Sequence, residues 1–130
     1  MPEPFELGKQ PIVAFVATGD AERARKFYRD NLGLRLVLDQ LPAALVFDAH
    51  GIMLRVTPVK ELHPPRYTVL GWEVPDIVAA AKALEKAGVR FERYTGFEQD
   101  ELGIWTAPGG VAKVAWFNDP DGNILSISQH

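Results

Sequence analysis

The sequence contains no cysteine, which excludes disulfides, thiolate metal sites and a cysteine nucleophile. It also has no apolar run near the roughly 20 residues that span a bilayer, and its first ten residues do not resemble a secretory signal. A cytoplasmic protein is therefore the default expectation. The net charge is -3 and no basic run is present, which argues against nucleic acid or an anionic membrane surface as the main partner.

Several catalytic signatures are absent as well. There is no nucleophile elbow, no phosphate-cradling glycine loop and no dinucleotide fingerprint. The three histidines, His50, His63 and His130, fall in a turn, a Pro-rich stretch and the terminus, without the spacing of a metal motif. We expect them to be solvated loop residues, and we expect the same of the acidic residues at 98, 100 and 101.

The chain does contain two similar series of secondary-structure signals. With 130 residues and 47% hydrophobic content it is expected to form one domain with a sizeable core. Residues 11–17 are apolar and β-branched, as in a strand buried on both faces. A helix follows, capped by Asp20 and stopped by Gly33, and then come β-like runs at 34–38, 43–48 and 52–57. The first series is therefore βαβββ.

After a Pro-rich linker the series starts again. A strand is predicted at 67–74, a helix from Asp76 to Gly88, a short strand at 91–94, a longer irregular segment at 95–110, and a closing hairpin around the turn Asp119-Pro120-Asp121-Gly122-Asn123. The predicted boundaries are about 10–58 for the first module, 59–66 for the linker and 67–129 for the second module.

The repeat can be checked at single positions. The two capping aspartates are 56 residues apart and the two stop glycines are 55 apart. At an offset of 71, Asp48 corresponds to Asp119 and Gly51 to Gly122, so the two hairpin turns also match. Two such modules are expected to bury their sheets around a common cleft.

Two segments resemble a known superfamily. The helix end Phe27-Tyr28-Arg29-Asp30-Asn31-Leu32-Gly33-Leu34 and the segment Phe117-Asn118 before the DPDGN turn are similar to the vicinal oxygen chelate superfamily of glyoxalases, fosfomycin and bleomycin resistance proteins and extradiol dioxygenases. The resemblance implies an α+β fold in which two βαβββ modules form a curved mixed sheet around a cleft, with the helices on the outer face. It also implies a homodimer, and it leaves open whether modules pair within a chain or between chains.

The resemblance further implies a divalent metal held by one residue at each of four strand positions. In this sequence those positions are Val13, Arg55, Val69 and Ser126. Valine has no lone pair, arginine repels a cation and serine is a poor ligand, whereas metal ions of this kind need carboxylates, imidazoles or several oxygens. The sequence therefore predicts no metal at the superfamily position.

Strand alternation predicts which side chains line the cleft. The predicted lining is Val13, Phe15, Ala17, Met53, Arg55, Val69, Gly71, Glu73, Ile124, Ser126 and Ser128. Arg55 and Glu73 are charges on this face, so they either pair with each other or leave Arg55 to bind an anionic or carbonyl group. Trp72 is predicted to be core, while Trp105 either joins the core or closes over the cleft. The candidate ligand-binding residues are Phe15, Met53, Arg55, Glu73, Trp105 and Ser126.

Three functions are compatible with this pattern. The favoured hypothesis is a small-molecule-binding protein that holds its ligand in an apolar cleft without a metal, by sequestration. The alternatives are a glyoxalase-like lyase or dioxygenase with unplaced metal ligands, and a dimerisation module that binds no ligand. No catalytic residue can be named, and the role of residues 95–110 is left open.

Overall fold

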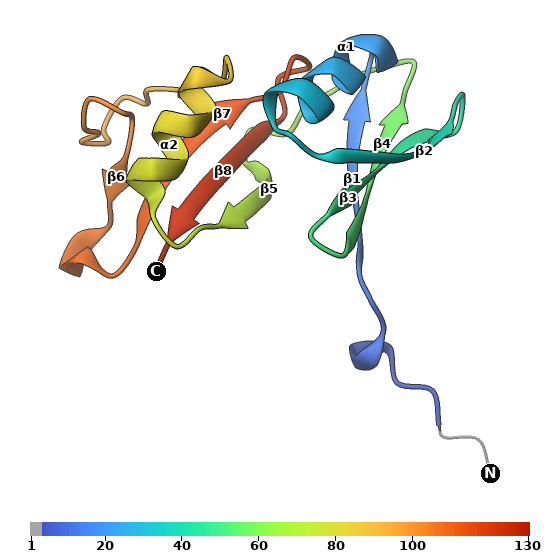
Figure 1. Cartoon of the computed structure of the whole chain (residues 1–130). Coiled ribbons are helices and arrows are strands. Elements are labelled where there is room, and N and C mark those ends of the chain that lie inside the picture. The colour runs from blue at the N-terminus through green and yellow to red at the C-terminus, as the bar shows by residue number, and fades with distance from the viewer. Residues whose placement is uncertain (1–3) are drawn as a thin grey trace.

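The computed structural model describes residues 4–130, which form two four-stranded mixed sheets with one helix each (Figure 1). The first module contains β1 Val13–Thr18, α1 Ala21–Lys26, the π-helical turn η2 Phe27–Asn31, β2 Arg35–Gln40, β3 Ala44–Ala49 and β4 Ile52–Pro58. The second contains β5 Thr68–Glu73, α2 Ile77–Lys86, β6 Trp105–Thr106, β7 Lys113–Asn118 and β8 Ile124–Gln129. The 3-10 turns η1 Leu7–Lys9 and η3 Pro108–Gly110 lie outside these strands and helices.

The strand order confirms the predicted α+β duplication. The first sheet has the order β1-β4-β3-β2 and the second the order β5-β8-β7-β6, so the modules share one topology. Both helices begin where the sequence predicts, because the carboxylates of Asp20 and Asp76 accept hydrogen bonds from the backbone N–H of Arg23 and of Ala79, each at 3.1 Å.

Two local predictions are wrong. Residues 91–94 do not form a strand, since only Phe91 makes an isolated bridge, with Phe117, and a loop then leads to the two-residue strand β6. The first strand is not buried on both faces either. Val16 is buried, but Val13 and Phe15 are exposed, because β1 is an edge strand whose second face is not covered within the chain.

One hydrophobic core runs through both modules. It contains side chains from both sheets and both helices, and its aromatic centre consists of Phe27, Tyr28, Phe47 and Phe117. The Phe27 ring lies 5.2 Å from the Tyr28 ring and 6.5 Å from the Phe117 ring, measured between centroids. The helical segment of the first module therefore packs onto the second sheet.

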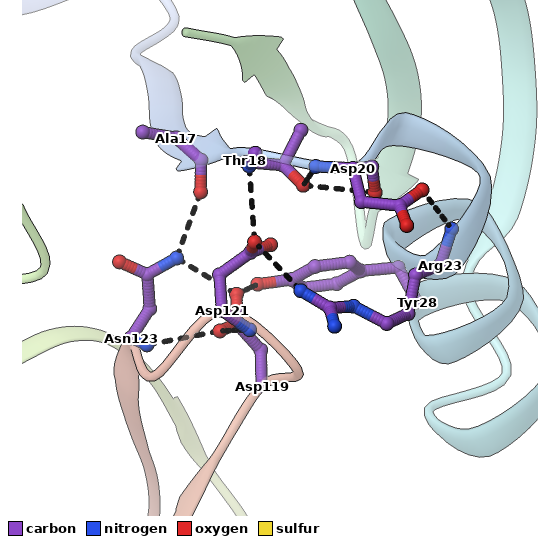
Figure 2. A network of polar contacts seen from close by, with 9 residues as sticks. Ala17, Thr18, Asp20, Arg23, Tyr28, Asp119, Asp121 and Asn123 are labelled. Carbon is purple, nitrogen blue, oxygen red and sulfur yellow. Dashed lines mark hydrogen bonds and ion pairs between the residues drawn. The ribbon is translucent and has the colours of Figure 1, made fainter. Parts of the chain in front are cut away.

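A buried polar network joins the modules beside this core (Figure 2). The Asp119 carboxylate accepts hydrogen bonds from the Tyr28 hydroxyl at 2.7 Å, from the Asn123 side chain at 2.8 Å, and from the backbone N–H of Asp121 and Asn123. The Asn123 side chain also donates to the Ala17 carbonyl at 2.9 Å. Burial, together with the Asp119 charge, raises the pKa of Tyr28, so its phenol stays protonated and remains the donor. The closing turn is thereby fixed to the first module.

The segment before β1 runs away from both sheets (Figure 1). Its large apolar residues Phe5, Leu7 and Ile12 are exposed. No helix in residues 4–130 is long and apolar enough to cross a membrane.

Candidate ligand-binding site

Each sheet has one face against the core and one face directed away from it, which we call the open face. In the second sheet, Leu125, Ile127, Ala115 and Phe117 point into the core. Their neighbours along the strands therefore lie on the open face. The strand register places two rows there, the first formed by Gly71, Ser126 and Trp116 and the second by Glu73, Ser128, Val114 and Trp105.

Four aromatic side chains gather at one side of this open face, and we call them the aromatic cluster: Tyr94, Phe97, Trp105 and Trp116. The Trp105 and Trp116 ring centroids are 6.0 Å apart, and the Phe97 ring lies 5.3 Å from Trp105 and 5.5 Å from Trp116. Tyr94 stands edge-on to Trp116 at 5.6 Å. Burial, with a smaller effect of the Glu92 charge, raises the pKa of Tyr94, so its ring stays neutral.

The cluster is part of the surface rather than of the core. Phe97 is 44% exposed, while Tyr94, Trp105 and Trp116 are half-buried. The aromatic centroids lie at separations that are typical of attractive edge-to-face packing. The cluster is therefore held in place by its own contacts and presents ring surface to solvent.

Beside Trp116 the face is flat because glycine occupies position 71. A Cβ atom built on Gly71 would lie 2.6 Å from the Ser126 Oγ, closer than two such atoms approach in proteins. Ser126 is itself buried in this position. The backbone of β5 and the Ser126 hydroxyl thus form a floor that continues from the indole of Trp116.

We expect Gly71→Ala to lower the free energy of unfolding by about 1–2 kcal/mol, because the new methyl group collides with Ser126 Oγ. Removing that oxygen in the double variant Gly71→Ala/Ser126→Ala should recover part of the loss. Urea denaturation of both variants and of Ser126→Ala alone checks this. Additive losses in the double variant would show that the serine is not the obstructing group.

The predicted residues of the first module lie on the other sheet. Phe15 and Arg55 are register partners on the open face of the first sheet, and Met53 lies on the same face of β4. The predicted ion pair between Arg55 and Glu73 is wrong, since no such contact occurs within the described part of the chain. Arg55 instead donates to the Gln40 side chain at 3.5 Å, and Glu73 contacts Ser128 and His130.

Val69 also differs from its predicted place. A register shift between Thr68 and Leu70 leaves Val69 unpaired, and its side chain packs against the core instead of lining the cleft. A bulge of this kind reverses the side-chain alternation that the prediction assumed. The side chains of Val13, Arg55, Val69 and Ser126 include no carboxylate or imidazole for a metal ion. Residues 4–130 contain no group of three or more His, Cys, Asp or Glu side chains that could hold one.

A separate groove of about 690 Å³ lies between the modules on the core side of β5. Trp72, predicted to be core, packs against the core and also lines this groove. The rest of the lining is mostly apolar and includes Leu32, Leu34, Ile52, Ala80, Ala83 and Leu84. The groove does not include the aromatic cluster, but Gly71 and Glu73 also line it.

The structure brings three predicted residues onto the second sheet's open face, Glu73, Trp105 and Ser126, and adds Tyr94, Phe97 and Trp116. The position of Trp116 on this face could have been predicted from the sequence. Counting outward from the closing turn pairs Asn118 with Ile124 and hence Trp116 with Ser126. Tyr94 and Phe97 had no such signal, because they lie in an irregular loop without periodicity.

The duplicated βαβββ topology defines a class of α+β domain that is built from two tandem modules. The family model described as the Glyoxalase/Bleomycin resistance protein/Dioxygenase superfamily matches residues 11–127. The chain belongs to this superfamily, which confirms the resemblance of its helix end and closing turn. No curated protein matches it.

Solved structures with the same fold come from several bacteria. A glyoxalase family protein from Bacillus anthracis has a TM-score of 0.72 at 16% identity, covering 100% of this chain and 99% of the other. The fosfomycin resistance protein FosX from Listeria monocytogenes has a TM-score of 0.70 at 11% identity, covering 100% and 95%. Lactoylglutathione lyase from Agrobacterium tumefaciens has a TM-score of 0.69 at 17% identity, covering 93% of each chain. At these identities the similarity establishes the fold alone.

Proposed function

We propose that this protein binds a planar organic molecule against the aromatic cluster and acts by sequestering it. The observation that carries the proposal is the gathering of four aromatic side chains on a sheet face that the core does not use. Aromatic walls beside a flat floor favour a flat ligand, which stacks on the rings. Such binding needs no catalytic residue.

The proposal includes no metal. Hard and borderline divalent ions require oxygen or nitrogen donors, and the four superfamily positions supply two valines, one guanidinium and one hydroxyl. The chemistry of these side chains supports binding through ring contacts, and it gives no support to a lyase or dioxygenase reaction that depends on a metal at that position.

We also propose that the protein is a cytoplasmic homodimer in which a second copy covers the cluster. The open face of the first sheet carries Val13, Phe15, Leu38 and Met53, with Phe15 63% exposed. Contiguous exposed apolar surface of this kind is typical of an interaction site. A second copy of the chain offers the matching apolar surface, since the aromatic cluster is the counterpart on the second sheet. A cleft formed in this way would place Phe15 and Met53 opposite the ligand, while the Arg55 guanidinium donates to the Gln40 side chain.

Acridine, a neutral flat three-ring molecule, tests the proposed site. We expect it to bind, and we expect Phe97→Ala and Trp105→Ala each to weaken binding roughly five- to tenfold through lost ring contact. Isothermal titration calorimetry measures the affinities. Pretreatment with EDTA should leave them unchanged.

The control is Ala83→Trp, which fills the groove between the modules from an exposed position of α2. It should leave the affinity unchanged. If Ala83→Trp abolishes binding and Trp105→Ala does not, the ligand occupies the groove and the proposed site is wrong. A requirement for metal would contradict the metal-free mode of binding.

A further inference from the structure

A polar network lies on the same open face as the aromatic cluster, at the end of β5 and β8. The Glu73 carboxylate accepts hydrogen bonds from the Ser128 hydroxyl at 3.0 Å and from the His130 backbone N–H at 2.8 Å. The His130 Nδ1 lies 2.7 Å from the same Glu73 oxygen that accepts the hydrogen bond from Ser128. His130 is exposed, as the sequence predicts, and its side chain also has a defined partner.

The network belongs to the same row of side chains as Trp105. Glu73 pairs with Ser128, Ser128 with Val114, and Val114 with Trp105. Adjacent strands are about 4.8 Å apart, so Glu73 lies two strands, or about 10 Å, from the strand that carries Trp116 and three strands, or about 14 Å, from the strand that carries Trp105. A molecule of two or three fused rings that stacks on the tryptophans can therefore extend one substituent to the network.

The network carries negative charge. The hydrogen bond from His130 lowers the pKa of Glu73, so this side chain is a carboxylate at neutral pH. A carboxylate favours a group that donates hydrogen bonds and carries positive charge.

Within the chain, the charge that acts on the aromatic cluster is also negative. Glu92 donates its backbone N–H to the Trp116 carbonyl, and its charge acts on Tyr94. The nearby guanidinium of Arg93 is turned away, since it donates to the backbone carbonyls of Gln99, Asp100 and Glu101. The faces of aromatic rings are themselves attractive to cations.

We propose that the ligand of this site is a planar cation, whose rings stack on Trp105 and Trp116 while its positively charged donor group contacts Glu73 and His130. This inference rests on the proposed function and specifies the chemical class of its ligand. The residues of the network are not at the superfamily metal positions, so this contact is separate from the question of a metal.

Two probes with the same three-ring skeleton test the charge. At neutral pH, 9-aminoacridine is a cation and acridine-9-carboxylate is an anion. We expect the protein to bind the cation about tenfold more tightly than the anion, measured by fluorescence anisotropy at low salt. Glu73→Gln preserves the shape of the side chain and removes its charge, so it should abolish most of this preference.

Glu61→Gln is the matched control. Glu61 also lies near a histidine, His63 at 3.7 Å, and both are exposed, but they belong to the linker and not to the open face. This variant should keep the preference of the wild type. An equal affinity for both probes, or a preference that survives Glu73→Gln, overturns the inference while leaving acridine binding intact. Absence of acridine binding would instead contradict the proposed function itself.

Discussion

Replacing Asp119 by alanine is expected to lower the free energy of unfolding by about 3–5 kcal/mol. The change removes a buried carboxylate that accepts four hydrogen bonds, and it leaves the Tyr28 hydroxyl and the Asn123 amide without their partner in the core. Small domains have a total stability of about 5–15 kcal/mol, so this one substitution removes a large share of it.

The internal repeat provides the control for this prediction. Asp48 is the counterpart of Asp119 in the first module, and its carboxylate accepts one hydrogen bond, from the Gly51 N–H at 2.9 Å, in an exposed turn. Asp48→Ala should cost no more than about 1 kcal/mol. The loss of stability in Tyr28→Phe should lie between those of the two aspartate variants, since this change removes a single hydrogen bond to Asp119.

Urea denaturation at one fixed protein concentration measures all three variants, because dimerisation would make the apparent stability depend on concentration. If Asp119→Ala and Asp48→Ala lose equal stability, then Asp119 is only a turn residue and the junction between the modules does not depend on it.

The second large effect is expected at Phe15, the most exposed side chain in the middle of the first sheet's open face. Phe15→Asp places a charge where we propose that a second copy packs, and we expect the dissociation constant of the dimer to rise at least about 100-fold. Sedimentation velocity at several concentrations should show a dimer for the wild type and a monomer for the variant.

Val78→Asp is the matched control for Phe15→Asp. Val78 is also an exposed apolar residue, at 39% exposure, but it lies on α2, away from both open faces. It should remain dimeric. A wild-type monomer at high micromolar concentration, or a dimer that tolerates Phe15→Asp, would contradict the proposed interface.

Local sequence patterns were sufficient for most of the fold. The helix starts at Asp20 and Asp76 and the closing turn at 119–123 depend on contacts between residues a few positions apart, and these can be read directly from spacing. The strand prediction at 91–94 was wrong for the opposite reason. Its aromatic residues Phe91 and Tyr94 suit a strand, but only Phe91 finds a partner strand, and pairing depends on distant residues.

The candidate site could be predicted only in part. Alternation placed Ser126 and Glu73 on the open face because β8 has a regular register, yet one register shift in β5 moved Val69 into the core. Arg55 and Glu73 were expected either to pair or to leave Arg55 for an anionic or carbonyl group, because a charge on the buried side of a sheet is costly without a partner. They lie on different sheets, and within the chain each has another partner.

The sequence by itself determined the superfamily, the two modules and the unsuitability of Val13, Arg55, Val69 and Ser126 as a metal-ligand set, because residue types and short spacings decide these features. Only the tertiary structure decided that Tyr94, Phe97, Trp105 and Trp116 form one aromatic surface. It also decided that Glu73 lies in the same row of side chains as Trp105 and that His130 contacts Glu73. These residues come from separate segments, and the strand register that aligns them is fixed by packing across the whole sheet.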